Sequence, residues 1–558
     1  MKKYLVLLIT LLTFILPTVA FAEVNPVVQP TLVMKTSTTL ANNADNPVVV
    51  SSTNSLLLDF GTILDGNTVT NAVKVFKVST KGLETEVPVN SVIDKINPSI
   101  LQIKTKDSVP FTQGEEFKIV VSPELKSSKG LSLSNNIEYF AVNYSFTLAK
   151  EGIAQLDSKR ELVVCISDIH LGIDDKYAEI KKNREDLKKF LEQIRYSPNV
   201  KELVIAGDLF DEWFIPAQLD TFNGKTQLDF IKLIAKNNKT IIDAFNNIIT
   251  DKKIKVTYVP GNHDLLFTAS DVQSVLPGIS QARDVQGLGA YSPENFPKAV
   301  IEHGHRYNFF CAPDPISNAK IAPGSILPPG YFFTRIATTS VIEGHPKAGG
   351  IMPEVTPNNI GVSQDLAYSY WQQWKGLMTA LPAKESFDEK FITTNIDGFK
   401  EDYSINEIMP YQTMKNGAIN VNLFKGSQDS WEARQTLNKV PIKTSVKNAI
   451  TNGGLASDSD EMSNIQYFSN PNSDKRIVVF GHTHEARILS YNTVNNQKAI
   501  YANSGTWIDK NTYPTMTFVV LIPQKTKYSM PSFVNLYQYS SEGVSTKLDA
   551  QALTKLNN

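Results

Sequence analysis

Short polar motifs at the ends of apolar runs hold six of the seven histidines of this chain. The first is Asp168-Ile169-His170, which follows the apolar run 162–166, a pattern typical of a buried strand. Residues two apart in an extended chain point to the same side, so Asp168 and His170 can reach one point. A carboxylate and an imidazole that converge in this way suit a divalent metal ion. The motif therefore predicts part of a metal site.

Four further motifs end other apolar runs and offer more ligands. They are Gly207-Asp208-Leu209-Phe210-Asp211, Gly261-Asn262-His263-Asp264, His303-Gly304-His305-Arg306 and Gly481-His482-Thr483-His484. The candidate ligands supply oxygen or nitrogen and are Asp168, His170, Asp208, Asn262, His303, His482 and His484. This set is too large for one tetrahedral zinc site and suits two metal ions that share a carboxylate. The remaining histidine, His345, lies outside the motifs and is expected to be structural.

In this order, the five motifs closely resemble those of the calcineurin-like metallophosphoesterase superfamily, over about residues 160–310 and 475–525. The resemblance implies a hydrolase of phosphate esters that uses two divalent metal ions, with Asp208 bridging them. The residues implied for the first ion are Asp168, His170 and His484. The residues implied for the second ion are Asn262, His303 and His482. Manganese, iron, zinc and nickel all accept such mixed oxygen and nitrogen ligands, so the metals stay open.

The resemblance also implies how the reaction proceeds. A hydroxide between the two ions would attack phosphorus in line with the leaving group. His263 would protonate the leaving oxygen or stabilise charge on the phosphoryl group, and Asp264 would orient its imidazole. Asp211 would support the loop of the bridging carboxylate or serve only as a turn residue. His305 would lie behind a ligand or face the substrate, and Arg306 would pair with a phosphate or lie at the surface.

Two alternative functions stay open. The stretch Gly-Asp-Leu-Phe-Asp-Glu-Trp at 207–213 resembles the UDP-diacylglucosamine pyrophosphohydrolase branch, which suggests a UDP-sugar-lipid or nucleotide pyrophosphate as substrate. That branch is cytoplasmic and usually has Arg where His263 stands here. The alternative of another class is a catalytically silent cell-surface binding protein. The complete ligand set and the His263-Asp264 pair favour a hydrolase, and no P-loop, His-Glu-x-x-His or Gly-x-Ser-x-Gly motif points elsewhere.

The elements that position these motifs alternate between strands and helices, which is typical of an α/β protein. With the family resemblance, the pattern predicts a layered αββα sandwich over residues 160–525. Strands are expected at 162–166, 202–206, 254–259, 299–302, 476–480, 499–502, 516–522 and 533–539. Helices are expected at 180–194 and 227–249, and residues 526–558 should hold a closing strand and a polar tail.

An insertion at 307–474 separates the fourth motif from the fifth. It begins rich in Pro and Gly and then shows helical periodicity at 364–381. The helical stripe consists of Ala367, Trp371, Trp374 and Met378, and we interpret it as core or lid packing rather than a substrate platform. The polar stretch 457–463 is expected to be a loop.

Residues 23–150 contain short alternating strands, at 55–60, 73–78, 117–121 and 139–148, which predict a β-sandwich. Leu57-Leu58-Asp59-Phe60 with Thr68-Val69, and Glu116 to Val121 with Leu125 and Gly130, resemble the bacterial Ig-like domains of surface proteins. This resemblance implies cell-surface association. The scattered carboxylates of this unit are expected to form a solvated face. A polar linker is expected at 150–160.

The N-terminus resembles a signal peptide over residues 1–22, with Lys2 and Lys3 before an apolar run and Ala20-Phe21-Ala22 as the cleavage site. An exported protein is expected, either secreted, periplasmic or at the cell surface, with no membrane span in the mature chain and an uncleaved anchor as the alternative. Its partner would be a phosphorylated small molecule or a lipid-linked substrate. The net charge of −1 gives no signal for nucleic acid binding. The two cysteines, Cys165 and Cys311, exclude a disulfide scaffold but leave a single bridge open.

Overall fold

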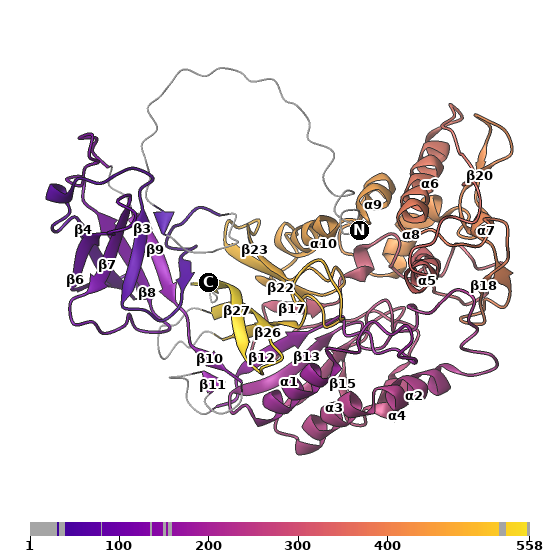
Figure 1. Ribbon diagram of the computed structural model, residues 1–558, viewed down its shortest axis with the longest axis horizontal. Coiled ribbons are helices and arrows are strands. Elements are labelled where there is room, and N and C mark those ends of the chain that lie inside the picture. Colours follow the sequence, from indigo (N-terminus) through magenta and orange to yellow (C-terminus); the bar gives the residue numbers. More distant parts are fainter. Residues whose placement is uncertain are drawn as a thin grey trace.

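The computed structural model describes residues 31–32, 40–79, 81–133, 137–148, 152–153, 159–523 and 532–554. The expected signal peptide and most of the expected linker lie outside these residues. The chain forms a β-sandwich, a central α/β unit and a helical region on the side of this unit away from the sandwich (Figure 1). Among the described residues, no helix combines the length and apolar character that a membrane span needs.

The N-terminal unit is a sandwich of two β-sheets, as its alternating pattern predicted. The first sheet has the order β1-β3-β7-β6, with β1 (Thr31–Leu32), β3 (Ser55–Asp59), β7 (Ile100–Thr105) and β6 (Val89–Ile93). The second has the order β2-β9-β8-β4-β5, with β2 (Val48–Val50), β9 (Ile137–Val142), β8 (Glu116–Val121), β4 (Val73–Val78) and β5 (Glu84–Val87). Alternate residues such as Leu58, Val75 and Ile119 are fully buried between the sheets. Short elements complete the unit: η1 (Gly66–Thr68), β10 (Phe146–Thr147) and β11 (Gly152–Ile153).

The first sheet of the central unit has the order β15-β14-β13-β12-β25-β26-β27. Its strands are β15 (Ser280–Gln281), β14 (Lys255–Val259), β13 (Val200–Ala206), β12 (Leu162–Ile166), β25 (Thr517–Ile522), β26 (Ser532–Tyr539) and β27 (Ser545–Leu553). From β12 to β15 the neighbouring strands pair in parallel, so their carboxyl ends meet at one edge of the sheet. The expected polar tail is wrong in part, because β27 extends the sheet and buries residues 550–553.

The second sheet of the central unit has the order β16-β17-β22-β24-β23. Its strands are β16 (Ala290–Tyr291), β17 (Ala299–Glu302), β22 (Ile477–Phe480), β24 (Lys498–Asn503) and β23 (Arg487–Asn492). The core between the two sheets joins residues such as Val163 and Val204 of the first to Val479 and Ala502 of the second. Helices cover both outer faces, which confirms the α/β class and the four predicted layers (Figure 1).

The helices over the first sheet differ from the prediction at one point. They are α1 (Arg184–Tyr196), α2 (Gln227–Asn237), α3 (Lys239–Asp251) and α4 (Ala269–Val275). The single helix expected at 227–249 is therefore wrong. It is interrupted at Asn238, whose buried amide donates to the carbonyls of Gly172 and Ile234. These bonds fix Asn238 outside the helical geometry, as expected of a side chain that competes for backbone groups.

The insertion folds as a helical region whose apolar side chains join the same buried cluster as those of the first sheet. Its helices are α5 (Pro329–Ile342), α6 (Val362–Ala380), α7 (Ile405–Ile408), α8 (Ser427–Leu437), α9 (Val446–Asn452) and α10 (Ala456–Ser463), with η2 (His305–Tyr307) before them and η3 (Asn464–Phe468) after them. Two-stranded pairs join β18 (Ile392–Thr393) to β19 (Asp402–Tyr403) and β20 (Tyr411–Gln412) to β21 (Ile419–Asn420). The predicted helix at 364–381 is confirmed by α6. Its stripe residues are buried, and the ring centroids of Trp374 and Phe333 are 4.0 Å apart.

The loop expected at 457–463 is wrong, because these residues form α10. Met462 packs into the apolar cluster under the second sheet, and Asp460 forms an ion pair with Arg487 of β23 at 2.8 Å. These tertiary contacts outweigh the polar composition from which the loop was expected. Both cysteines are free, so no bridge joins Cys165 to Cys311.

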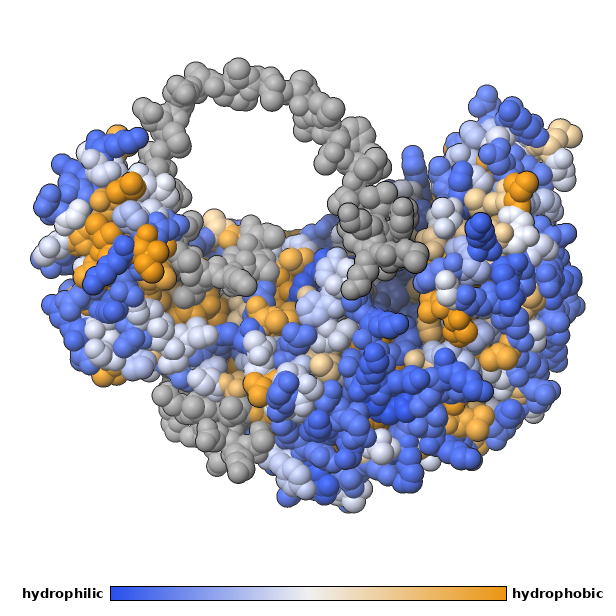
Figure 2. Space-filling view, viewed as in Figure 1, coloured by the Kyte–Doolittle hydropathy of each residue, from blue (hydrophilic) through white to orange (hydrophobic). Residues whose placement is uncertain are grey.

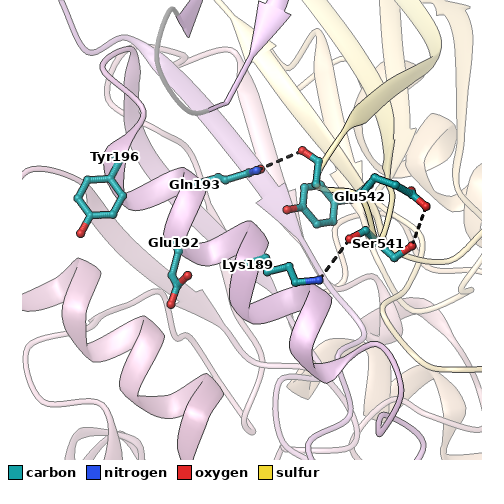
Figure 3. A pocket seen from close by; sticks show the side chains of 8 residues that line it. Lys189, Glu192, Gln193, Tyr196, Ser541 and Glu542 are labelled. Atoms are coloured by element: carbon teal, nitrogen blue, oxygen red, sulfur yellow. Dashed lines mark hydrogen bonds between the residues drawn. The ribbon is translucent and has the colours of Figure 1, made fainter.

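The β-sandwich contacts the strand pair β26–β27 of the first sheet. The side-chain amide of Asn143 donates to Asn535 at 2.8 Å, and the ring of Tyr144 meets that of Phe533 at 6.0 Å. Apolar residues are visible on the sandwich and on the upper part of the central unit in the view of Figure 2, whereas the lower part of the central unit is largely hydrophilic. A surface hollow between α1 and the turn after β26 is lined by residues such as Lys189 and Glu542 (Figure 3). None of the sequence motifs lines this hollow.

Candidate metal centre

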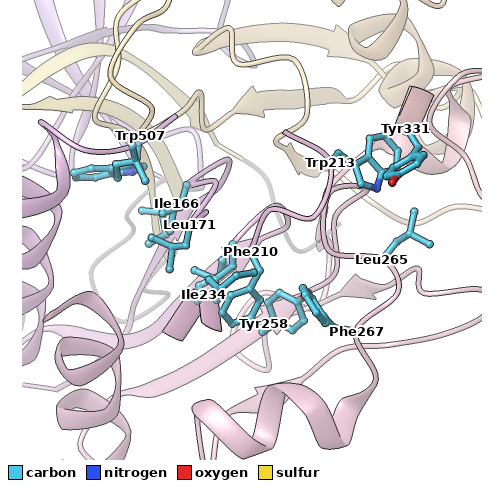
Figure 4. Close-up of a cluster of buried hydrophobic side chains, with 14 of the residues drawn as sticks. Ile166, Leu171, Phe210, Trp213, Ile234, Tyr258, Leu265, Phe267, Tyr331 and Trp507 are labelled. Carbon is cyan, nitrogen blue, oxygen red and sulfur yellow. The ribbon is translucent and has the colours of Figure 1, made fainter. Parts of the chain in front are cut away.

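The five motifs meet because each follows a strand whose carboxyl end lies on the same side of the two sheets. Asp168, Asp208 and Asn262 come just after β12, β13 and β14. His303 and His482 come just after β17 and β22 of the facing sheet. Strand ends of this kind are where α/β folds place their ligands. The apolar side chains of Ile166, Leu171 and Phe210, among others, form the packing beneath the loops (Figure 4).

Asp168, His170 and His484 form one group whose ligand atoms all lie within 4.8 Å of one another. His484 Nε2 is 3.2 Å from Asp168 Oδ1 and 3.1 Å from His170 Nε2. The Nδ1–H of His170 is turned to the carboxylate of Asp211 at 3.3 Å, so its Nε2 carries a lone pair toward the group. Lone pairs of nitrogen and oxygen that converge in this way repel one another, and a proton or a metal ion among them offsets this repulsion.

Asp208 lies between this group and a second one formed with Asp168 and His303. His303 donates its Nδ1–H to the carbonyl of Ala206, so its Nε2 is free to face the site. That nitrogen is 3.1 Å from Asp208 Oδ2 and 3.0 Å from the side-chain oxygen of Asn262. Asp208 Oδ2 is also 3.6 Å from His170 Nε2. One carboxylate therefore reaches both groups, as a bridging ligand must.

His482 approaches the site from the facing sheet. Its ring centroid lies 5.1 Å from that of His303, and its backbone N–H donates to the carboxylate of Asp168 at 3.1 Å. The structure thus brings all seven predicted ligands together at one edge of the two sheets. Their donor set of carboxylate, imidazole and amide oxygen, with no thiolate, fits the harder divalent transition metals.

Five of these residues have the left-handed backbone conformation, with φ between 51° and 72°. They are Asp168, His170, Asp208, His482 and His484. For residues other than Gly this conformation is uncommon and costs on the order of 1 kcal/mol each, although Asp and His tolerate it better than most. Such outliers gather at functional sites, where the surrounding fold holds them in place.

Glycines next to the ligands permit the close approach of the chains. A Cβ on Gly207, whose φ is +88°, would lie 2.3 Å from Nδ1 of His303. A Cβ on Gly261 would lie 2.0 Å from Oδ1 of Asp208. Both distances are far below van der Waals contact, so these positions require glycine.

The electrostatics of the site also call for added positive charge. Burial opposes ionisation of Asp208, but His303 and His263 more than offset it and hold the pKa of Asp208 well below its usual range. In return, the carboxylates of Asp208 and Asp168 overcome the effect of burial and raise the pKa of His303 to about 9. Burial and the neighbouring His303 lower the pKa of His482 to about 3. Divalent cations would supply the charge that these carboxylates otherwise draw from protonated imidazoles.

Comparison with known families identifies the origin of this arrangement. The family model described as calcineurin-like phosphoesterase matches residues 162–334, which hold four of the five motifs. Residues 162–334 therefore match the calcineurin-like phosphoesterase family, and strands that follow them complete the two sheets. The match covers the strands from β12 to β17, and the fifth motif follows the insertion. No curated protein matches the chain.

Among solved structures, two similar ones belong to the surface layer protein SbsC. Its domains 1–6 share 16% identity with a TM-score of 0.16, covering 23% of this chain and 16% of that one. The N-terminal part of the bacterial S-layer protein SbsC shares 18% identity with a TM-score of 0.16, covering 22% of this chain and 27% of that one. The copper resistance protein PcoC from Escherichia coli shares 13% identity with a TM-score of 0.15, covering 18% of this chain and 91% of that one.

His263 of the phosphoesterase domain lies beside the ligands, and its partner differs from the prediction. Its Nδ1–H donates to Oδ1 of Asp211 at 2.8 Å, and its ring stacks on Trp213 at 4.9 Å. The prediction that Asp264 orients this imidazole is wrong. The Asp264 carboxylate instead accepts the backbone N–H groups of Gly261, at 2.6 Å, and of Leu209, at 2.9 Å. Asp264 therefore joins the second and third motif loops.

Asp211 is a junction of hydrogen bonds rather than a simple turn residue. Its Oδ1 accepts the backbone N–H groups of Trp213 and Phe214 as well as the proton of His263. Its Oδ2 faces Nδ1 of His170 at 3.3 Å. Despite burial, His263 and His170 lower the pKa of Asp211, so its carboxylate is ionised.

Sequence reasoning missed Glu179, which lies in the loop between β12 and α1. Its Oε2 is 3.3 Å from Nδ1 of His170, and it forms a further group with His170 and Asp211. No motif marks this position, because the loop that carries Glu179 reaches the site only after folding.

The two remaining candidates have different environments. His305 is buried, its ring lies 5.3 Å from that of His303, and neither of its ring nitrogens has a hydrogen-bond partner in the described part of the chain. It therefore lies behind a ligand. Both expectations for Arg306 are wrong: it is buried, forms ion pairs with Glu302 and Asp284, and donates to the carbonyl of Asn438. The insertion and the loop of Asp284 enclose it, so it is a structural cation.

Proposed function

We propose that this chain hydrolyses phosphate esters at a two-metal centre, with His263 assisting the leaving group. The observation that carries the proposal is the convergence of carboxylate, imidazole and amide ligands from both sheets on Asp208. The phosphoesterase domain supplies the reaction class, and the described groups supply the residues.

Within this proposal, each ion has three ligands of its own, and Asp208 is shared by both ions. The ligands of the first ion are Asp168, His170 and His484. The ligands of the second are Asn262, His303 and His482. Two bound cations would polarise the phosphoryl oxygens and make a water molecule more acidic. The protein's own contribution is to hold the ligands in place from strand ends that are fully buried.

His263 is suited to handle a proton at its other ring nitrogen. Its Nδ1–H is held by Asp211, which leaves Nε2 for the substrate, and its side chain is 13% exposed. Although burial and His170 oppose protonation, Asp211 and Asp208 raise the pKa of His263. The raised pKa favours the protonated imidazole, which can donate a proton from Nε2 to a leaving oxygen.

The packing of the insertion favours a simple ester over a lipid-linked pyrophosphate. Trp371 and Trp374 are buried within the insertion, so they offer no exposed aromatic platform to an acyl chain. Arg306, which was expected to pair with a phosphate, forms ion pairs with Glu302 and Asp284 instead. We infer that substrate contacts come from the loops at the strand ends.

A hydrolysis assay with added manganese tests the proposal. Nitrophenyl phosphate, bis-nitrophenyl phosphate and a nucleotide-sugar pyrophosphate are compared as substrates for the wild type, Asp208→Asn and His263→Ala. Both variants should lose activity by at least about 100-fold on the preferred substrate, since each removes a group that acts in the reaction. His345→Asn is the matched control, because His345 is an exposed histidine outside the motifs. Equal activity in all four proteins would refute the proposal, and a preference for the pyrophosphate would replace the simple ester.

We also propose that the chain is exported and that its β-sandwich associates with the cell surface. The signal-type N-terminus and the Ig-like sequence pattern support this location. Expression of the full chain in a bacterial host, followed by N-terminal sequencing of the extracytoplasmic fraction, tests export. The mature protein should begin at Glu23, and retention in the cytoplasm would contradict the proposal.

A further inference from the structure

Two carboxylates flank the ring nitrogen of His170 that faces away from the candidate metal centre. Oδ2 of Asp211 and Oε2 of Glu179 are each 3.3 Å from Nδ1 of His170. Only the approach of Asp211 has hydrogen-bond geometry, and Glu179 places a second carboxylate oxygen at the same distance from Nδ1. The His170 side chain is fully buried, whereas that of Glu179 is 18% exposed.

The loop that carries Glu179 is fixed by the segment after β24. The backbone N–H of Asp509 donates to the carbonyl of Glu179 at 2.9 Å. The carboxylate of Asp509 in turn accepts the backbone N–H groups of residues 181–183. Nearby, Thr506 donates its hydroxyl to the carbonyl of Asp168 at 2.8 Å. The same segment therefore positions Glu179 and the first ligand of the site.

Asp211 holds His170 by one long hydrogen bond, at 3.3 Å between Oδ2 of the carboxylate and Nδ1 of the imidazole. Its other oxygen, Oδ1, accepts from His263 and two backbone N–H groups. A second carboxylate on the Nδ1 side of His170 adds negative charge there, which makes Nε2 a better electron donor to a cation. With Glu179 present, His170 depends less on Asp211 for its orientation. Asp211 can then stay aligned with His263.

We propose that Glu179 is a positioning residue of the metal centre, which holds the imidazole of His170 with its Nε2 directed at the first metal ion. This inference rests on the proposed function and extends it to a residue outside the five motifs. Glu179 touches neither the metal ion nor the substrate, and it acts through His170.

Metal affinity measured directly on the apo-protein tests this role without reference to activity. Zinc or manganese is titrated in competition with a chromophoric chelator, for the wild type, Glu179→Ala, Glu179→Asp and Glu185→Gln. Glu179→Ala should bind metal about 10- to 100-fold more weakly, the range for lost partners of a metal-bound histidine, and Glu179→Asp should recover part of this loss. Glu185→Gln, an exposed carboxylate at the start of α1, should bind like the wild type.

A second measurement separates positioning from general loss of structure. Glu179→Gln and Asp211→Asn act on the same N–H of His170, so their effects on metal affinity should not add in the double variant. Unchanged metal affinity in both Glu179→Ala and Glu179→Gln would overturn the role of Glu179 while leaving the two-metal hydrolase intact. A wild type that neither binds metal nor hydrolyses phosphate esters would overturn both proposals.

Discussion

The carboxylate of Asp211 accepts a hydrogen bond from the imidazole of His263, with 2.8 Å between Oδ1 and Nδ1. The other oxygen of the same carboxylate faces His170 at 3.3 Å. One buried carboxylate thus connects a candidate metal ligand to the candidate acid. A substitution of Asp211 should therefore affect both metal binding through His170 and protonation of the leaving group by His263.

Asp211→Asn should abolish most activity while leaving the fold intact. The amide keeps the shape of Asp211 and can still accept backbone N–H groups, but it no longer holds a charged His263. We expect kcat to fall by about 100-fold or more, in the range ascribed to a lost general acid. Steady-state kinetics on nitrophenyl phosphate measure the loss.

Asp264→Asn provides the contrast, because the Asp264 carboxylate accepts the backbone N–H groups of Gly261, Leu209 and Phe210 rather than the imidazole of His263. We expect it to lower the free energy of unfolding by about 1–3 kcal/mol, the cost of weakened charged hydrogen bonds in a buried place. If Asp264→Asn kept full stability but lost activity as Asp211→Asn does, the prediction from sequence that Asp264 orients His263 would be supported.

Metal removal should lower thermal stability. Without a cation, Nε2 of His170 and Nε2 of His484 face each other at 3.1 Å, and the surrounding carboxylates repel. Ions that bind only the folded state stabilise it by about 2.7 kcal/mol at a concentration 100 times Kd. Thermal unfolding of chelator-treated protein, with and without added manganese or zinc, measures this difference. Asp208→Asn should show a much smaller gain from metal, and an equal gain in that variant would place the ions elsewhere.

The strand-end position of every motif could be predicted from sequence. Apolar runs of four to seven residues such as 162–166 and 477–480 are bounded by polar residues, and parallel strands bring their carboxyl ends together. That rule places Asp168 and Asp208 at one edge of the first sheet without any knowledge of contacts. The helical stripe of α6 followed equally from local periodicity.

Side-chain partners could not be predicted, because they depend on loop geometry. Because His263 and Asp264 are adjacent, the sequence suggested that Asp264 orients His263. In the structure the Asp264 carboxylate binds the backbone of Gly261 instead, and Asp211 from another loop is the partner of His263. Arg306 and Glu179 depend on distant segments, the insertion at Asn438 and the loop at Asp509. No local pattern encodes such contacts.

Gly261→Ala should weaken metal binding although Gly261 offers no ligand. Its Cβ would lie 2.0 Å from Oδ1 of Asp208 and must displace the bridging carboxylate. We expect an affinity loss of at least about 10-fold, since metal ligands tolerate little displacement. Gly376→Ala in α6 is the matched control: no atom lies within 4 Å of its added Cβ, and the helix should gain up to about 1 kcal/mol. Equal metal affinity in the two variants would contradict this geometry.

Lys498, at the start of β24, should make stability rise with pH. Its side chain is buried and donates to Gln551 at 2.9 Å, and burial lowers its pKa from 10.5 to about 7. Between these two values the unfolded chain binds more protons than the folded chain, so the free energy of unfolding increases with pH, by up to about 1.4 kcal/mol per pH unit. Below about pH 7 the full cost of the buried ammonium is present. Denaturant unfolding of the wild type and Lys498→Met measures this cost, with the exposed Lys415→Met as control. The advantage of Lys498→Met should shrink as pH rises from about 7 to about 10, and a constant difference would show that Lys498 is not the titrating group.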